Sequence, residues 1–139
     1  MGHVRYLAFY ILCGLAAAAA QTYMNPSSPL PMVGASGAIS GVMGAYIILY
    51  PRVRVHMLVI LGFFITRIVV PAYLMLGYWF AIQLLGGSLS GEQGGVAFWA
   101  HAGGFIAGAI LIHVFRDPEL VAKHRALSKT IDQLAYRER

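Results

Sequence analysis

Four apolar segments, separated by short polar stretches, limit what this chain can fold into. They cover approximately residues 4–21, 36–50, 71–85 and 96–115. An apolar run of about 20 residues crosses a bilayer as a helix, because each residue adds about 1.5 Å toward a hydrocarbon core of about 30 Å. With 59% hydrophobic and 11% charged residues, the chain is far more apolar than an average soluble domain. These features predict an all-α, polytopic helical membrane protein.

The second apolar segment, residues 36–50, begins after a loop with three prolines and ends at Pro51. Proline cannot continue a helix, so the segment is confined between these positions. At about 1.5 Å per residue it reaches only about 22 Å, so one end should lie below the membrane surface. Irregular backbone at that depth is tolerated only inside the protein or beside a water-filled cavity. If the submerged end is the N-terminal one, Ser36 lies on the floor of such a cavity.

The stretch 52–70, between the second and third segments, is compatible with two structures. Arg54 and His56 alternate with apolar residues, which is typical of a strand. Gly62 would then form the turn of a hairpin. A continuous spanning helix would instead place Arg67 well inside an apolar stretch. We therefore favour an interfacial hairpin or a short amphipathic element over a spanning helix.

The basic residues are distributed unevenly along the chain. None of the ten lysines and arginines falls in the polar stretches 22–35 and 86–98. The positive-inside rule produces such a pattern, because loops rich in Lys and Arg stay in the cytoplasm. We expect a membrane domain over residues 1–116 and a charged cytoplasmic tail over 117–139. The net charge of +5 follows from this topology and does not indicate a nucleic-acid partner.

Two glycine-rich stretches each hold one reactive polar side chain at the end of an apolar segment. Ser36 lies in the sequence GASG, and His101 lies in the sequence AHAGG. A polar or ionisable side chain at membrane depth is costly, and by default it marks a functional site. A serine needs a neighbouring base to act as a nucleophile, and neutral histidine is the usual one. No Asp or Glu lies in the four segments, so the chain offers at most a Ser-His dyad.

The spacing of small residues predicts how the two segments meet. Small residues three, four or seven positions apart share one helix face and let two helices approach closely. The glycines that we expect to pack around the site are Gly34, Gly37, Gly41, Gly104 and Gly108. If these faces meet, the His101 ring comes near the Ser36 hydroxyl. Because Ser36 starts a helix, its backbone N–H would be free to stabilise an oxyanion.

The sequence indicates neither a cofactor nor a metal site. The single cysteine, Cys13, lies inside the first apolar segment, which excludes a disulfide framework. We expect it to be a small apolar packing residue. The four other histidines are expected to have no catalytic role: His3, His56, His113 and His124.

These stretches resemble the rhomboid family of intramembrane serine proteases. The resemblance rests on GASGAISG around Ser36, on AHAGGFIAG around His101, and on PAYLMLGYWF at residues 71–80. It implies a helical bundle with a water-filled cavity, and cleavage of peptide bonds in or near the transmembrane helices of substrate proteins, without metal or nucleotide. It implies Ser36 as the nucleophile and His101 as the general base. It also implies a multi-pass protein of the bacterial inner (plasma) membrane.

The chain departs from the family pattern in its first spans. The resemblance covers only the last four of six core spans, so we expect the C-terminal portion of a longer protease. The second span of the family brings a histidine and an asparagine that help to form the oxyanion hole, and neither His3 nor Asn25 matches them. Losing one such donor costs about 10²–10³ in rate, so this chain by itself is expected to be weakly active or inactive. Some members also have a tyrosine at the position of Ser40, so the residue that holds His101 is left open.

Two alternatives to a protease remain at this point. One is a non-catalytic rhomboid-like protein that binds transmembrane clients, although a pure binder needs neither Ser36 nor His101. The other is a four-helix membrane scaffold, which accounts for the glycines but not for the paired serine and histidine. The partners expected for the protease are transmembrane protein substrates and the lipid bilayer. The sequence favours no particular oligomeric state.

Overall fold

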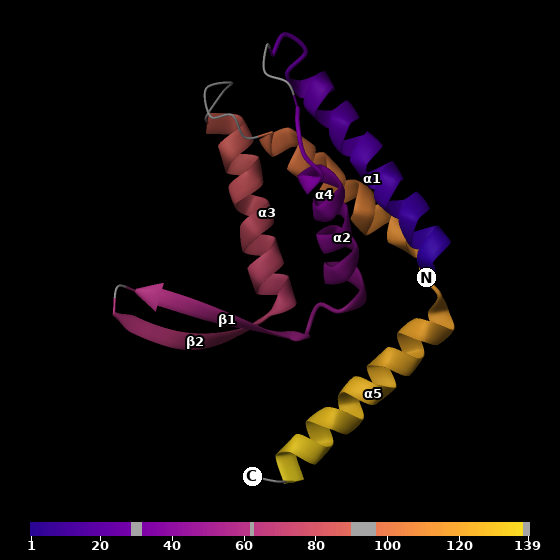
Figure 1. The fold of residues 1–139 in the computed structure, drawn as a ribbon, viewed down its shortest axis with the longest axis vertical. Helices are drawn as coiled ribbons and strands as arrows, with labels where there is room; N and C mark the ends of the chain where they lie inside the picture. Colours follow the sequence, from indigo (N-terminus) through magenta and orange to yellow (C-terminus); the bar gives the residue numbers. More distant parts are fainter. Residues whose placement is uncertain (29–31, 62, 90–96, 138–139) are drawn as a thin grey trace.

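The computed structural model describes residues 1–28, 32–61, 63–89 and 97–137. Its elements in chain order are α1 (His3–Met24), α2 (Ser36–Leu49), β1 (Arg54–Leu61), β2 (Phe64–Pro71), α3 (Ala72–Leu89), α4 (Phe98–Phe115) and α5 (Pro118–Arg137). Figure 1 shows α1 to α4 gathered in a bundle, with the β1–β2 hairpin projecting sideways from one end and α5 leading away from that end. The prediction of a mainly helical, polytopic bundle is confirmed.

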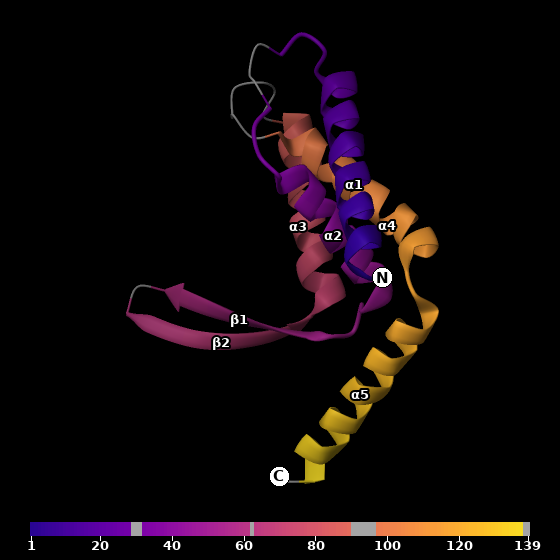
Figure 2. The ribbon, with the colours of Figure 1, turned by 45° about the vertical axis from the view of Figure 1, so that its right-hand side comes forward.

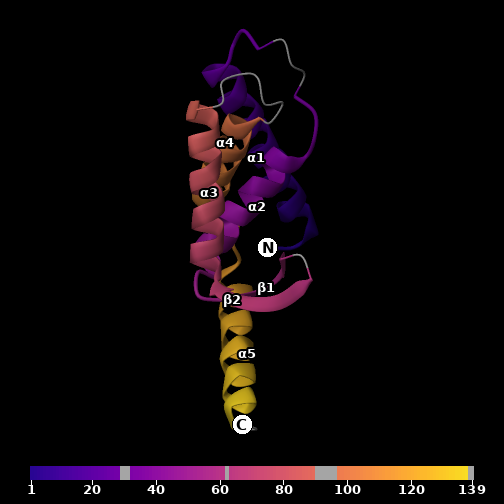
Figure 3. The ribbon, with the colours of Figure 1, turned by 90° about the vertical axis from the view of Figure 1, so that its left-hand side faces the viewer.

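Three of the helices in the described part of the chain are long and apolar enough to cross a membrane: α1, α3 and α4. Helix α2 has only 14 residues, so it reaches about 21 Å. It contacts the other three helices and lies among them (Figure 3). Its buried residues are all small: Gly37, Ala38, Ser40, Gly41, Gly44 and Ala45. The neighbouring helices cover the face of α2 that carries these small residues, and they accommodate a helix too short to span.

The backbones of α2 and α4 meet where both helices lack side chains. A Cβ atom built on Gly104 would overlap the carbonyl oxygen of Gly37, and one built on Gly108 would overlap that of Gly41. On the α1 side, a Cβ on Gly37 would lie 2.6 Å from the Cβ of Ala17. The glycines therefore permit a three-helix contact that any larger residue would separate.

Two buried apolar clusters hold the helices together. The first joins α1, α2 and α4 and consists of Phe9, Cys13, Ala45 and Ile112. The second joins α3 to α4 and consists of Ala72, Leu76 and Phe105. The ring of Phe105 stacks on that of Phe80 with 4.6 Å between centroids. Cys13 is fully buried, in keeping with its expected packing role.

The segment between α2 and α3 is a hairpin rather than a helix. Strands β1 and β2 pair in antiparallel fashion, with Arg54 opposite Pro71 at one end and Leu61 opposite Phe64 at the other. The residue predicted for the turn, Gly62, lies outside the described residues. Pro71, expected to open the third span, instead ends β2, and α3 begins at Ala72.

Helix α3 extends beyond the end predicted for it. The expected span stopped at Leu85 and a glycine-rich loop followed, but the helix continues to Leu89. The aromatic rings at the start of α4 explain the difference, because they pack on the bare backbone of these glycines. A Cβ on Gly86 would lie 2.5 Å from the ring of Phe98, and one on Gly87 would lie 2.8 Å from the indole of Trp99. The rest of that loop, residues 90–96, and residues 29–31 of the first loop lie outside the described residues.

At the end of the bundle that carries the hairpin (Figure 2), two arginine side chains cap helices. Arg125 of α5 donates a hydrogen bond of 2.9 Å to the carbonyl of Leu49, the last residue of α2. Arg5 does the same for Val114 in the last turn of α4, also at 2.9 Å. A positive charge at a helix C-terminus is favourable because it meets unpaired carbonyls and the negative end of the helix dipole. These contacts tie α5 to the end of α2, and the start of α1 to the end of α4.

Candidate functional site

Ser36 is the first residue of α2 and follows a turn that requires glycine. The φ angle of Gly34 is +120°, a backbone conformation that residues with a Cβ rarely adopt. Because of this turn, the chain enters α2 abruptly and the side chain of Ser36 remains exposed. The first helical hydrogen bond at this end joins the N–H of Ile39 to the carbonyl of Ala35 at 3.0 Å. The N–H groups of the residues before Ile39 therefore have no carbonyl in the helix to bond with.

His101 lies in the first turn of α4, whose N-terminus is anchored by α1. No side chain of the cap residue Ala97 closes this helix end. Instead, the N–H of Ala100 donates to the side-chain oxygen of Gln21, at 3.1 Å. An N-terminal N–H left unpaired inside the protein would be costly. Gln21 therefore stabilises the turn that carries His101.

The His101 ring lies between two side chains from different helices. Its Nε2 atom is 2.9 Å from the hydroxyl oxygen of Ser36 on α2. Its Nδ1 atom is 2.8 Å from the amide oxygen of Gln83 on α3. An amide oxygen only accepts hydrogen bonds, so Nδ1 carries the hydrogen and Nε2 is left to accept the Ser36 hydroxyl. The chain of contacts runs from Ser36 through His101 to Gln83.

Gln83 was not among the residues singled out from the sequence. Its side chain is only 7% exposed, which fits a polar group that is satisfied by a hydrogen bond. Trp79, one helical turn earlier on α3, places its ring centroid 5.8 Å from that of His101. The signal in the sequence was an uncharged polar residue inside an apolar span, four positions after a tryptophan and so on the same helix face.

Ser40 does not take part in holding the histidine ring. Its hydroxyl donates to the carbonyl of Ser36 at 2.7 Å, so it bonds within its own helix. The support of His101, which the sequence left open, comes from α3 through Gln83 and Trp79. The other glycines predicted at the site follow Ser36 on α2 and His101 on α4, where they allow the two helices to approach: Gly37, Gly41, Gly104 and Gly108.

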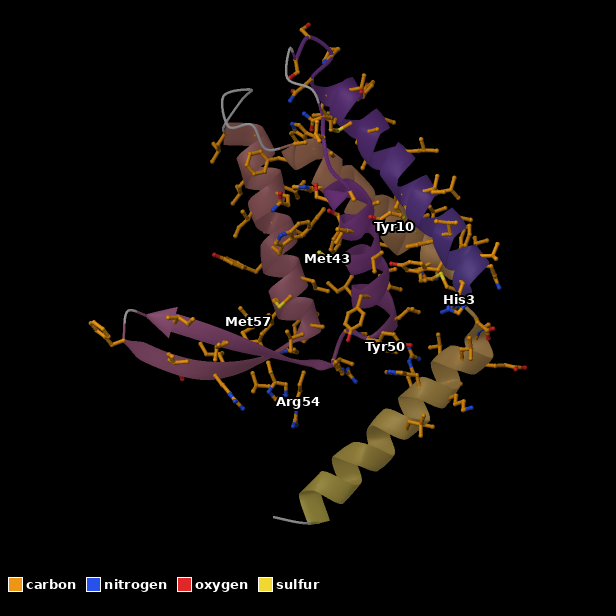
Figure 4. All side chains as sticks on the ribbon, in the orientation of Figure 1. His3, Tyr10, Met43, Tyr50, Arg54 and Met57 are labelled. Carbon is orange, nitrogen blue, oxygen red and sulfur yellow. The ribbon has the colours of Figure 1, made fainter. Side chains whose placement is uncertain are left out.

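A cavity of about 180 Å³ adjoins Ser36 on the side of α1. Its walls come from the segment before α2 and from α1 and α4, with Ala17 and Ala100 among the lining residues. Of the described residues that line it, Ser36 is the one with a polar side chain. His3 is labelled in Figure 4 at the opposite end of α1, and Asn25 follows the last residue of α1. Neither of them lines the cavity.

The described residues contain no group of three or more His, Cys, Asp or Glu side chains close enough to hold a metal ion together. What the arrangement offers chemically is a hydroxyl, an imidazole base and an amide that orients the base. The hydroxyl and the imidazole lie in the first turns of α2 and α4, next to backbone N–H groups, and the amide lies on α3.

The chain is similar to a known protein family. The family model of the Rhomboid domain matches residues 1–118, which include every helix of the bundle. Neither the curated proteins nor the solved structures gave a match. With a family match over most of its length and helices apolar enough to cross a membrane, the chain belongs to the rhomboid family and is an integral membrane protein.

Proposed function

We propose that the chain carries the active site of a rhomboid-type intramembrane serine endopeptidase, which cleaves peptide bonds in or near the transmembrane helices of substrate proteins. The observation that carries this proposal is the pair of hydrogen bonds at His101: Nε2 accepts from the Ser36 hydroxyl at 2.9 Å, and Nδ1 donates to the Gln83 amide oxygen at 2.8 Å. A serine and a histidine within hydrogen-bond reach, with a third group orienting the ring, are the signature of an activated nucleophile.

In the proposed reaction, Ser36 attacks the carbonyl carbon of the scissile bond while its proton passes to Nε2 of His101. The carbonyl oxygen becomes an oxyanion, which the N–H of Ser36 at the start of α2 stabilises. The protonated His101 then gives its proton to the leaving amine as the peptide C–N bond breaks. An ester of Ser36 remains. Water, activated by His101, hydrolyses this ester and restores the serine.

The role proposed for Gln83 is to position His101. Its amide oxygen accepts the hydrogen of Nδ1, which keeps the ring in the tautomer that accepts from Ser36. Because Gln83 is neutral, it stabilises the imidazolium ion less than a carboxylate would. Trp79 restricts the ring from the same helix. The site therefore depends on α3, although Ser36 and His101 lie on α2 and α4.

We also propose how the protein sits in its membrane. Residues 1–116 would form the membrane domain and 117–139 a cytoplasmic tail. The described basic residues Arg5, Arg54 and Arg125 belong to the end of the bundle with the hairpin and α5, which favours that end for the cytoplasm. Ser36 begins α2 at the other end and would face the exterior. In a bacterium this arrangement corresponds to the inner membrane.

A fluorophosphonate probe tests the proposal because it reacts with an activated serine without needing the natural substrate. The full chain in its membrane should be labelled, and Ser36→Ala should abolish the labelling. Ser40→Ala is the matched control, one turn further along α2, and should leave most of the labelling. Labelling that persists in Ser36→Ala, or no labelling of the unmodified chain even after prolonged exposure to the probe, contradicts the proposed protease. Slow labelling agrees with the weak activity expected from the sequence.

A second function is favoured by one observation, the lack of polar side chains other than Ser36 among the described residues lining the cavity. A rhomboid-like protein that binds transmembrane clients needs no oxyanion donors there. It would show no probe labelling, and Ser36→Ala would not change the membrane proteins that it retains. The probe experiment therefore separates the two functions.

Substitution of Gln83 tests the positioning role. Methionine has a similar length to glutamine but no acceptor for Nδ1–H. We therefore expect Gln83→Met to lower the maximal rate at which the probe inactivates the protein about tenfold to a hundredfold. The concentration of probe giving half-maximal rate should not change, because Gln83 contacts Nδ1 of His101, whereas Ser36 contacts Nε2. Gln83→Glu keeps an acceptor oxygen and should restore most of the rate. Equal losses in both variants would show that Gln83 acts only in packing.

A further inference from the structure

The two faces of the β1–β2 hairpin differ in charge. Residues paired across antiparallel strands point to the same face, and successive pairs alternate between faces. One face, called here the apolar face, carries the cross-strand pairs Val55–Val70, Met57–Ile68 and Val59–Thr66. The opposite face, called here the cationic face, carries the pairs Arg54–Pro71, His56–Val69, Leu58–Arg67 and Ile60–Ile65, so apolar residues lie among its charges. Every charged residue of β1 and β2 lies on the cationic face.

The apolar face is turned toward the helices. Val55 packs against the buried cluster that joins α3 to α4, and it lines a cavity of about 210 Å³ together with Met43 and Leu76. Figure 4 places Met57 on the side of the hairpin toward the bundle and Arg54 on the side away from it. The hairpin thus leaves the bundle with its apolar face directed toward the level of the spanning helices.

Much of the hairpin has nothing in the described chain to cover it. Met57 and Ile68 of the apolar face are 38% and 45% exposed, and Phe63 near the tip is fully exposed. Figures 1 and 2 show the hairpin projecting to one side, with its far end well apart from the helices. Strands of eight residues extend about 26 Å, so the hairpin reaches well beyond the bundle. An apolar surface of this extent needs an apolar partner.

Two physical constraints limit the depth at which the hairpin lies. A two-stranded sheet has unpaired N–H and C=O groups along both edges, and such edges do not occur in contact with the hydrocarbon core. Exposed Ile, Leu and Phe side chains are equally unfavourable in water. The interfacial layer satisfies both, because headgroups and water reach the edges while apolar side chains enter the acyl region.

The charges identify the kind of lipid that fits. The hairpin contains Arg54, His56 and Arg67, and Arg52 lies two residues before it. The chain has no Asp or Glu before residue 92. Arginine binds phosphate through several donors in one plane. A cationic face without acidic residues, adjoining an apolar face, is complementary to a bilayer with anionic headgroups.

We propose that the hairpin docks on the leaflet beside it, with its apolar face on the acyl chains and with Arg54 and Arg67 on the headgroups of anionic phospholipids. The hairpin is then a lipid-binding element of the protein, and it sets the position of α2 and α3, which it connects. This inference rests on the membrane location of the family and not on the proposed protease activity. Loss of probe labelling would leave it standing.

Spin labels on neighbouring residues of β1 test which face meets the lipid. Met57→Cys and His56→Cys are made in the full chain, and the buried Cys13 makes the unmodified chain the unlabelled control. With one chain in each nanodisc, the label at 57 should collide mainly with oxygen, which partitions into lipid. The label at 56 should collide mainly with a water-soluble nickel chelate. Equal access of the chelate to both positions overturns the proposal.

The lipid requirement is tested in the same nanodiscs with phosphatidylcholine alone or mixed with phosphatidylglycerol. Two arginines near an anionic surface should shift the ratio of docked to undocked hairpin about 30-fold. When phosphatidylglycerol is present, this shift should protect the label at position 57 from the nickel chelate. Arg54→Gln with Arg67→Gln should remove this dependence. Arg116→Gln with Lys123→Gln, which removes the same charge elsewhere, should keep it.

Two results would overturn the anionic-lipid proposal. Equal protection in phosphatidylcholine alone would show that the apolar face suffices without headgroup charge. Protection that appears only with two chains per nanodisc would assign the surface to a second copy of the chain.

Discussion

Ser36→Ala and His101→Ala are each expected to lower the rate of the proposed serine chemistry at least about 10³-fold, and the double variant no further. The two side chains share one hydrogen bond of 2.9 Å, so removing either one disables the other. Residues that act as a unit show such non-additive losses. The measurement is the second-order rate constant for inactivation by a fluorophosphonate, determined for the single and double variants in the same membrane preparation.

His113→Ala is the matched control for this cycle. His113 lies on α4 like His101, is exposed, and sits near the other end of the helix. It should leave the rate constant unchanged. Losses that multiply in the double variant, or a comparable loss in His113→Ala, would show that Ser36 and His101 do not act together.

Gly108→Ala is expected to destabilise the bundle by about 1–3 kcal/mol or more, and to weaken the site from a distance. A Cβ at this position would overlap the backbone of Gly41, its carbonyl oxygen first. Backbone atoms cannot move aside as a flexible side chain would, so α2 and α4 must separate. Gly108 lies two turns from His101 on α4 and touches neither member of the pair. The measurement is the midpoint of denaturant-induced unfolding in detergent micelles, followed by circular dichroism.

Gly77→Ala supplies the comparison because a Cβ on Gly77 has nothing within 4 Å in the structure. Alanine in a helix is favoured over glycine by about 1 kcal/mol, so this variant should be neutral or slightly more stable. An equal effect of the two substitutions would mean that the glycine contact between α2 and α4 does not limit stability. Recovery of probe labelling in Gly108→Ala on cooling would link the loss to helix separation.

The spans and the Ser-His pair were accessible from the sequence because their signals are local. Hydropathy over a window of residues predicts a membrane helix regardless of its neighbours, and glycines at helical spacing indicate a close helix contact. The ends of helices were harder to predict from the sequence. The extension of α3 to Leu89 depends on Phe98 and Trp99 packing onto its glycines, and those rings belong to the next helix.

The partners of His101 likewise depend on contacts between helices and not on a local sequence pattern. Ser40 occupies the position from which some rhomboids support the ring, yet its hydroxyl bonds the carbonyl of Ser36. The support comes instead from Gln83, 18 residues before His101 in the chain. Gln21 stabilises the start of α4 across a separation of 79 residues. No local pattern specifies which residue of one helix meets which residue of another.

By itself, the sequence determined a polytopic helical membrane protein of the rhomboid type, with one serine and one histidine framed by glycines at helix ends. It did so because bilayer insertion, turn formation and close packing each leave a short-range pattern in residue type. The tertiary structure decided that α3 supplies Gln83 to the histidine and that the hairpin turns its apolar face toward the bundle. Those outcomes depend on how the helices pack against one another, and packing is a property of the whole assembled chain.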